Sequence, residues 1–370
     1  MNIVIIAGEV SGDIHGGKLV AELKKQNPQI ELSGIGGDQM IQHGFNAIYH
    51  VKQMAFLGIG EIIKHLPFIR NVFNTLVAHV QKEQPDAVIL IDYPGFNLRF
   101  AKALHKLGIP VIYYISPQLW AWGKRRVKKI KKYVDKMLVV FPFEVDFYKK
   151  HGIEAEYVGH PLVDEHFDKT KSKNKNENKV LGLLPGSRKH EIEQLLPDML
   201  ETARILFYNS KISKAVIAKV DNIDESIYNK IDGDKYRYVE LSNKPIPEFY
   251  NSLDAAITKS GTSTLETAYF GVPFIIVYRV SKLTWFLGNL LVKLDSIGLA
   301  NIVAGKKVAD ELLQNEFTPQ KAADLISKLL NPEKNEEKRN ELKIVREKLG
   351  EQGASKRVAK SILEFVSHKI

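Results

Sequence analysis

Cysteine is absent from all 370 residues of this sequence. Its absence excludes disulfide bonds and metal sites built on thiolates, and it suits a reducing compartment. No run of apolar residues approaches the roughly 18 that a membrane-spanning helix requires. The first residues carry neither the basic segment nor the small-residue cleavage site of an export signal. We therefore expect a cytoplasmic protein.

The residues that are present describe an ordinary globular protein with an excess of basic side chains. Hydrophobic residues make up 44% of the chain and charged residues 26%, which are usual proportions. A chain of 370 residues exceeds what one core usually supports, so we expect two domains. The net charge of +10 favours a phosphorylated substrate, an anionic membrane surface or nucleic acid, although solvated lysines on helix faces explain it equally well.

Short runs rich in Val and Ile alternate with segments of helical length, which predicts parallel sheets covered by helices. In the first half the expected strands are 2–8, 86–92, 110–116 and 136–142, and the expected helices are 14–25, 60–82, 97–107 and 122–133. In the second half the expected strands are 180–187, 214–220, 238–242, 255–261 and 273–279, and further helices are expected within 337–366.

The fold class is therefore α/β, with two Rossmann-like doubly wound domains facing a cleft. We expect the domains at 1–167 and 180–335, joined by a linker or exposed loop at 168–179 that has no apolar residue. Whether the C-terminal helices at 336–370 pack back on the first domain is left open. Such sheets bind ligands beyond the carboxyl ends of their strands, so the loops at those ends are the places to look for a site.

The segment AGEVSGD follows the first expected strand. Gly8 and Gly12 permit a tight turn and a close approach of the backbone to a ligand. Glu9, Ser11 and Asp13 supply groups that hydrogen-bond to hydroxyls. Ser11 is equally suited to cap the helix that follows. The segment is thus a candidate for binding a substrate, with helix capping as the alternative.

The strand at 86–92 ends in Asp92, within the motif IDYPGFN. A carboxylate at the tip of a buried strand is partly desolvated, which raises its pKa and makes it a usable general base. Pro94 and Gly95 are turn residues, so capping of the helix that begins near Phe96 is an equal alternative for Asp92.

Two strand-to-helix turns in the second half favour a diphosphate. LLPGSRKHEIE combines a helix N-terminus, whose free amides attract anions, with the forked cation of an arginine. The turn SGTSTLE offers small residues and hydroxyls, followed by a carboxylate suited to two ribose hydroxyls or to helix capping. The candidate donor-binding residues are Gly186, Ser187, Arg188, Ser260, Gly261, Thr262 and Glu266.

Two further stretches are candidates for contact with a membrane. Segment 54–70 has apolar residues near helical spacing, which form either a core stripe or an exposed patch that meets acyl chains. Segment 116–132 combines two tryptophans with basic residues, a pattern that suits an anionic lipid surface, nucleic acid or a solvated helix face. The candidate contacts are Phe56, Ile59, Ile62, Ile63, Lys124, Arg125 and Arg126.

No metal site and no organic cofactor are predicted. Asp232 and Asp234 form an Asp-x-Asp pair, but they lie in a polar loop where a plain turn is favoured. The histidine spacings match no pattern of metal ligands.

These motifs resemble, in order along the chain, those of the lipid-A-disaccharide synthase family. The resemblance rests on AGEVSGD, GIGGDQM, IDYPGFN, YYISPQLWAW, FPFE, EYVGHPL, LLPGSRKHEIE, SGTSTLE and LANIVAG, which run from residue 7 to residue 305. It implies a GT-B fold and an inverting glycosyltransferase. The implied reaction moves 2,3-diacylglucosamine from its UDP donor to 2,3-diacylglucosamine 1-phosphate, and it forms the β-1,6 disaccharide 1-phosphate of lipid A.

The resemblance also implies roles for individual residues. Asp92 matches the family's base, and Arg188 matches its arginine after Pro-Gly-Ser. Glu266 and Asn301 fall where the family's donor domain contacts the nucleotide. Gly95 stands where some relatives carry a second acid, which favours Asp92 as the working carboxylate.

The implied partners are the two sugar substrates and the anionic inner face of the inner membrane, with the acceptor lying near residues 9–13. Nucleic acid is not expected as a partner, and a homodimer is left open. The alternative functions are another GT-B enzyme that acts on a UDP-sugar, and a basic RNA-binding protein. Participation of Glu9 or His190 in the chemistry is also left open.

Overall fold

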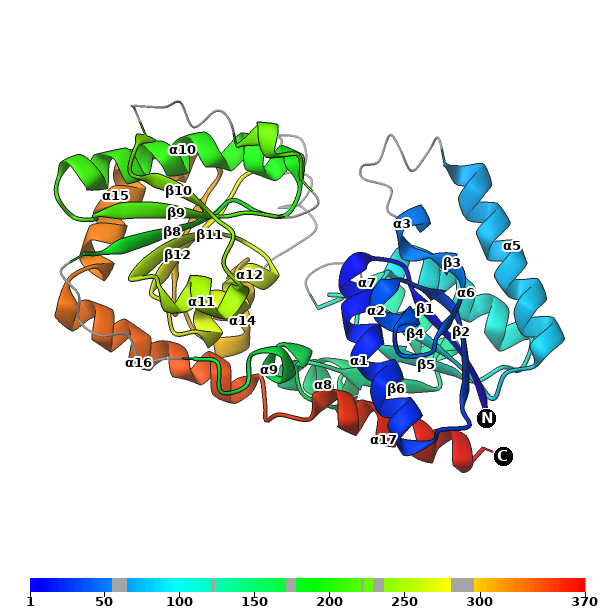
Figure 1. The fold of residues 1–370 in the computed structure, drawn as a ribbon. Helices are drawn as coiled ribbons and strands as arrows, with labels where there is room; N and C mark the ends of the chain where they lie inside the picture. Colours follow the sequence, from blue (N-terminus) through cyan, green and yellow to red (C-terminus); the bar gives the residue numbers. More distant parts are fainter. Residues whose placement is uncertain are drawn as a thin grey trace. The chain divides into compact units, whose positions relative to one another are not determined.

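The computed structural model describes residues 1–54, 65–120, 124–170, 178–220, 223–228, 236–280 and 296–369. The chain divides into two compact units (Figure 1). The first unit comprises Met1–Glu165 and Glu351–Ile370, and the second comprises His166–Gly350. Each unit is one parallel sheet with helices packed on it, so the two doubly wound units expected from the sequence are confirmed.

The first sheet has seven strands in the order β3-β2-β1-β4-β5-β6-β7. Its order reverses between β1 and β4, the two strands that start the two halves of the sheet. Both strands are apolar along nearly their whole length and are buried on both faces, as central parallel strands require. The strands are β1 (Asn2–Ala7), β2 (Glu31–Gly36), β3 (Asn46–His50), β4 (Ala87–Ile91), β5 (Val111–Tyr114), β6 (Lys136–Val139) and β7 (Ala155–Tyr157).

Helices of the first half of the chain connect these strands. The bounds are α1 (Val10–Gln26), α2 (Asp38–Ile41), α3 (Val51–Met54), α5 (Leu66–Glu83), α6 (Pro94–Lys106), α7 (Lys124–Tyr133), α8 (Pro142–Lys149) and α9 (Pro161–His166). Proline stands in the first turn of α5, α6 and α8, where its missing N–H costs no helical hydrogen bond.

The second sheet has six parallel strands in the order β10-β9-β8-β11-β12-β13, which reverses between β8 and β11. Its strands are β8 (Val180–Leu184), β9 (Lys214–Ala218), β10 (Val239–Ser242), β11 (Ala255–Lys259), β12 (Phe274–Tyr278) and β13 (Asp310–Leu313). The helices of this unit are α10 (Lys189–Tyr208), α11 (Ile246–Asn251), α12 (Thr262–Tyr269), α14 (Leu299–Ala304), α15 (Pro319–Leu329) and α16 (Pro332–Lys348), with short 3-10 turns at Glu225–Ile227 and Gln314–Glu316. The last helix of the chain, α17 (Ala354–Ser367), belongs to the first unit.

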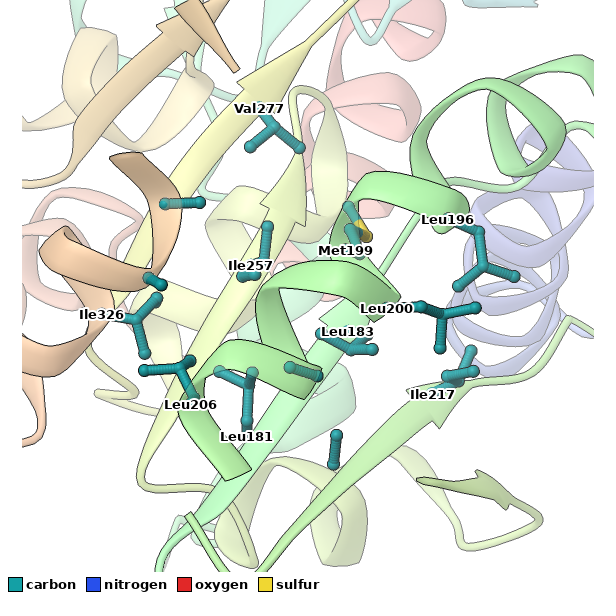
Figure 2. Packing of buried hydrophobic residues seen from close by; sticks show 14 of the residues in the cluster. Leu181, Leu183, Leu196, Met199, Leu200, Leu206, Ile217, Ile257, Val277 and Ile326 are labelled. Carbon is teal, nitrogen blue, oxygen red and sulfur yellow. The ribbon is translucent and has the colours of Figure 1, made fainter. Parts of the chain in front are cut away.

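The core of the second unit lies between this sheet and α10 with α15 (Figure 2). Leu183 of β8 and Ile257 of β11 lie beneath Met199 of α10, and all three side chains are fully buried. Burial of one such side chain stabilises the fold by about 1.5–3 kcal/mol. The core thereby fixes β8 and β11 side by side, and with them the two turns that follow these strands.

The C-terminal helices belong to different units. Arg339 of α16 donates hydrogen bonds to the carbonyl oxygens of Gly271 (3.0 Å) and Leu253 (3.1 Å), which ties α16 to the second unit. The first amides of α17, at 353–355, all donate to the carboxylate of Asp164 in the first unit. The segment 336–370, which the sequence pattern treats as one piece, is therefore divided at Gly350.

Candidate active site

In each sheet, two strand-to-helix loops leave neighbouring strands at the carboxyl edge, at the point where the strand order reverses. Such a point is where doubly wound sheets bind ligands. In the first unit these loops are 8–9, between β1 and α1, and 92–93, between β4 and α6. In the second unit they are 185–188, between β8 and α10, and 260–261, between β11 and α12. Each of the four loops contains residues that the sequence analysis selected.

Asp92 is a half-buried carboxyl at the end of β4. Burial, together with the negative charge of Glu9, raises the pKa of Asp92 to about 6, against the opposing effect of the Tyr93 backbone N–H. The direction of this shift agrees with the desolvation expected for a carboxyl at the tip of a buried strand, and the role of Asp92 as a base stays a prediction. A carboxyl with this pKa is about nine-tenths ionised at pH 7, and it accepts a proton more readily than an ordinary aspartate does.

The backbone that carries Asp92 is held in an uncommon conformation. Asp92 and Tyr93 have φ angles of 44° and 45°, in the left-handed region, where each non-glycine residue costs of order 1 kcal/mol or more. The buried amide of Asn97 donates to the carbonyl oxygens of Asp92 (2.8 Å) and Ile91 (3.2 Å). The hydroxyl of Tyr113 also donates to the Asp92 carbonyl oxygen. Two buried side chains thus fix the direction in which the Asp92 carboxyl leaves the sheet.

Gly8 is required by the aromatic ring of Tyr93. A Cβ atom placed on Gly8 would lie 2.2 Å from Cδ1 of that ring, so no larger residue fits without a shift of the loop. The tight turn that we expected at Gly12 is not present, because Gly12 lies within α1. A Cβ on Gly12 would make an ordinary 3.4 Å contact with Ala7. Of the two glycines, only Gly8 serves close packing between the two loops of this site.

Of the polar residues of AGEVSGD, two are exposed and one is buried. Glu9 and Ser11 are exposed at the start of α1. Asp13 is only 5% exposed, and its carboxylate accepts the backbone N–H groups of Gly37 (2.7 Å), Gln39 (3.1 Å) and Met40 (3.2 Å). Asp13 therefore caps the N-terminus of α2, a use that leaves its oxygens already engaged.

In the second unit a carboxylate that the sequence analysis did not select joins the two loops. Glu191, in the first turn of α10, accepts the backbone N–H of Ser187 (3.2 Å). Its other oxygen lies 2.8 Å from the ammonium nitrogen of Lys259, at the end of β11, and 3.6 Å from the guanidinium of Arg188. Arg188 is 56% exposed, whereas Glu191 and Lys259 are only 10% and 18% exposed.

Glycine is needed in the first of these loops for two reasons. Gly186 has a φ of 119°, which L side chains rarely adopt. A Cβ there would also lie 2.4 Å from the carboxylate of Glu191. Gly261 in the second loop has a φ of 150°. His190, in the first turn of α10, is exposed.

The loop before α12 is fixed by hydroxyl groups. Ser260 donates to the carbonyl oxygen of Ile297 (2.9 Å), and Thr264 donates to that of Gly261 (2.8 Å). Thr262 is exposed at the start of the helix. Glu266, one turn further, is half-buried and accepts the hydroxyl of Tyr250 (3.0 Å). These hydrogen bonds fix the conformation of the loop and so the positions of its exposed atoms.

Asn301 is buried, with 2% of its surface exposed. Its amide oxygen accepts the backbone N–H groups of Val308 and Ala309, and its amide nitrogen donates to Ala309 and Glu311. Glu311 in turn accepts the N–H of Gly298 (3.0 Å), at the N-terminus of α14. Every polar atom of the Asn301 side chain is thus engaged within the second unit.

The candidate membrane contacts are described only in part. Within α7, Val127 and Ile130 are buried in the core of the first unit. Phe56, Ile59, Ile62 and Ile63 and the side chains of Lys124 and Arg125 lie outside the described residues. Across the described ranges, no helix is long and apolar enough to cross a membrane. The exposed basic residues of α7 are Arg126, Lys128, Lys129, Lys131 and Lys132.

The part of the chain that the structure describes holds no group of three or more His, Asp or Glu side chains arranged to bind a metal ion. Asp232 and Asp234 lie outside the described residues.

Residues of two further motifs, FPFE and EYVGHPL, have structural roles in the first unit. The carboxyl of Glu144, from FPFE, is 1% exposed and accepts the N–H of Phe141 (3.1 Å). His160, from EYVGHPL, is buried against the Phe141 ring, with centroids 5.1 Å apart, and burial lowers the pKa of His160 to about 3.

Comparison with known proteins gives a consistent result. The family model described as lipid-A-disaccharide synthetase matches residues 3–365. A curated lipid-A-disaccharide synthase from Myxococcus xanthus (strain DK1622) is 38% identical over 374 residues, which cover 98% of this chain and 97% of that protein.

Solved structures share the fold. A putative UDP-N-acetylglucosamine 2-epimerase from Listeria monocytogenes superposes with a TM-score of 0.70 at 14% identity, over 100% of this chain and 97% of the other. UDP-GlcNAc 2-epimerase from Neisseria meningitidis, solved with UDP-GlcNAc bound, has a TM-score of 0.66 at 13% identity, over 98% and 100% of the two chains. At such identities the likeness shows the fold alone, and the expected GT-B class is confirmed.

Proposed function

The chain belongs to the lipid-A-disaccharide synthase family, and on this premise we propose which of its residues carry out the family's reaction. The enzyme transfers 2,3-diacylglucosamine from UDP-2,3-diacylglucosamine to 2,3-diacylglucosamine 1-phosphate, and it releases UDP. Its substrates are thus a nucleotide-sugar donor and a lipid acceptor. The donor is α-linked and the product is β-linked, so one in-line displacement suffices and no covalent intermediate is needed.

We assign Asp92 as the general base that takes the proton from the acceptor's 6-hydroxyl as that oxygen attacks the anomeric carbon. The observation that carries this assignment is a carboxyl with a pKa near 6, fixed on a strained turn at the carboxyl edge of the sheet. A positioned base of this kind typically contributes about 10²–10⁴-fold to the rate. Tyr113 and Asn97 act as positioning residues, because they hold the backbone of Asp92 and not its carboxyl.

We assign the acceptor to the loops of the first unit. Glu9 and Ser11 are exposed there and offer hydrogen bonds to sugar hydroxyls. Val10 and Ile14, one helical turn apart, are 52% and 41% exposed, although they are apolar. They suit the start of an acyl chain, which removes their surface from water. Asp13 supports this site by fixing α2 against α1 and does not touch the sugar.

We assign the UDP group to the loops of the second unit. The N-termini of α10 and α12 present backbone amides, and Arg188 adds an exposed cation beside Ser187. These groups stabilise the charge that UDP gains as it leaves. Glu266 is placed for the ribose hydroxyls, while Asn301 acts indirectly by holding Glu311 and the start of α14.

We propose that the enzyme works on the anionic cytoplasmic face of the inner membrane. The support comes from α7, where the apolar residues face the core and the basic residues are exposed. Each such cation near an anionic surface contributes about 1 kcal/mol to membrane binding at moderate salt. The apolar stripe within 54–70 remains the candidate for contact with acyl chains.

One experiment tests the proposed reaction. The purified protein is mixed with UDP-2,3-diacylglucosamine and 2,3-diacylglucosamine 1-phosphate, and the lipid products are analysed by mass spectrometry. A new species with the mass of the disaccharide 1-phosphate supports the proposal. Conversion of UDP-N-acetylglucosamine to its 2-epimer, without disaccharide formation, would instead assign the chain the activity named for its structural neighbours.

A further inference from the structure

The two loops of the second unit are joined by a network of charges, and this network suggests a binding residue beyond those already assigned. We propose that Lys259 is a second cationic contact for the donor's diphosphate, and that Glu191 holds its ammonium group until the diphosphate arrives. This inference rests on the assignment of UDP to the second unit. It adds a residue that neither the motifs nor the comparisons identify.

Lys259 lies where the two loops of the second unit come together. Lys259 is the last residue of β11, so its side chain leaves the sheet at the carboxyl edge, where the strand order reverses. Its ammonium nitrogen lies 3.8 Å from the position that a Cβ on Gly261 would occupy. It lies 2.8 Å from Glu191, which also binds the N–H of Ser187. The ammonium group of Lys259 thus lies between the two loops assigned to the diphosphate.

Glu191 contacts groups from both loops. Its carboxylate accepts a backbone N–H at the Gly186–Ser187 turn, lies against Lys259 and is near the guanidinium of Arg188. An N–H at such a turn, a lysine and an arginine are the groups that bind a phosphate oxygen in many proteins. The carboxylate of Glu191 therefore binds the same kinds of group that an anionic ligand would bind at this position.

The balance of charge gives the direction of the effect. Arg188 and Lys259 carry two positive charges and Glu191 one negative charge, so the three together carry +1. The diphosphate of the donor brings two negative charges, and UDP gains more when the bond to the sugar breaks. A lysine side chain is long and flexible enough to turn from a carboxylate to a phosphate oxygen. Lys259 then attracts UDP, while the charge of Glu191 opposes UDP.

The experiment measures the affinity of the full-length protein for UDP by isothermal titration calorimetry. Lys259→Met should weaken binding by about ten-fold or more, the loss typical of one hydrogen bond to a charged group. Glu191→Gln keeps an oxygen for the Ser187 N–H but removes the charge, so it should strengthen binding by roughly three-fold or more. The double variant lacks both charges, so it should bind UDP more tightly than Lys259→Met alone but more weakly than the unaltered protein.

Lys214→Met is the matched control. Lys214 is paired with Glu240 at 2.9 Å and lies at the first residue of β9, on the opposite edge of the same sheet. The Lys214→Met change should leave the affinity for UDP unchanged. Thermal unfolding of each variant checks that the second unit stays folded. If Lys259→Met does not fold, the Glu191→Gln variant tests the inference alone: tighter UDP binding supports it, and weaker binding contradicts it.

Unchanged affinity in Lys259→Met, or weaker affinity in Glu191→Gln, would show that the pair only supports the loop and would overturn the inference. Failure of the unaltered protein to bind UDP at all would instead contradict the proposed donor site itself.

Discussion

Asp92→Asn should make the first unit more stable at neutral pH, although it removes the base. Folding raises the pKa of Asp92 from 3.8 to about 6. A raised pKa means that the folded state holds the proton more tightly than the unfolded state does. The stability contributed by Asp92 is therefore complete below about pH 4, and it is lost as the pH rises through 6.

The shift of about two pKa units sets the size of this effect at about 2–3 kcal/mol. Asparagine is uncharged at both pH 4 and pH 7, so residue 92 of the variant contributes no pH dependence to the free energy of unfolding. Relative to Asp92→Asn, the unaltered protein should thus lose about 2–3 kcal/mol of unfolding free energy between pH 4 and pH 7. Any constant difference in hydrogen bonding between the two side chains cancels in this comparison.

Urea unfolding followed by tryptophan fluorescence measures the difference. A Trp285→Phe background leaves Trp120 and Trp122, both in the first unit, as the reporters. Asp13→Asn is the matched control, because its carboxylate accepts three backbone N–H groups. That change should destabilise the protein by about 1–3 kcal/mol. A pH-independent difference between the unaltered protein and Asp92→Asn would refute the reasoning, since burial would then not penalise the charge.

Three further sets of variants test the positioning of Asp92, the packing at Gly8 and the membrane contact. Asn97→Ala should lower kcat by about ten-fold or more with little change in KM. Tyr113→Phe should lower kcat less, because Tyr113 holds one carbonyl oxygen and Asn97 holds two. A change in KM as large as the change in kcat would argue against a positioning role. In steady-state assays, Gly8→Ala should lower kcat, because the added Cβ displaces the ring of Tyr93. Gly12→Ala should leave kcat unchanged, because its Cβ makes only an ordinary contact with Ala7. Replacing Lys128 and Lys129 by Glu should release the protein from anionic vesicles in a flotation assay, and unchanged binding would move the membrane contact elsewhere.

The acid limb of kcat/KM gives another expected result. Activity should rise as the pH passes through about 6, where Asp92 loses its proton in the free enzyme. Glu9→Gln should move this limb to lower pH, because the charge of Glu9 contributes to the raised pKa of Asp92. A limb near pH 4 in the unaltered protein would mean that another group controls the rate.

The sequence predicted the fold well wherever strands are long and continuously apolar. The central strands β1, β4, β8 and β11 are of this kind, and all were expected. Four strands were missed. β2 contains two glycines, β3 carries Asn and His, β7 has only three residues, and β13 begins with two acids. These segments form strands because an existing parallel sheet pairs with them, a tertiary effect that local composition does not report.

For the site, position along the strand was a better guide than the chemistry of the side chain. Asp92 and Arg188 were predicted because the ends of parallel strands meet at one edge of a sheet, and the structure has both residues in loops that follow central strands. Asp13 and Asn301 have side chains suited to a sugar or nucleotide, but both use them on the protein's own backbone. The ion pair between Glu191 and Lys259 was not predicted, because a contact between two distant loops leaves no signal in local spacing.

The most direct test of the central claim compares the unaltered protein with Asp92→Asn in both donor binding and product formation. Binding of UDP-2,3-diacylglucosamine is measured by calorimetry, and the disaccharide 1-phosphate is counted by mass spectrometry after mixing with the acceptor. We predict that Asp92→Asn binds the donor about as well as the unaltered protein does but forms disaccharide at least about 100-fold more slowly. Disaccharide formation at an undiminished rate would contradict the assignment of Asp92 as the base.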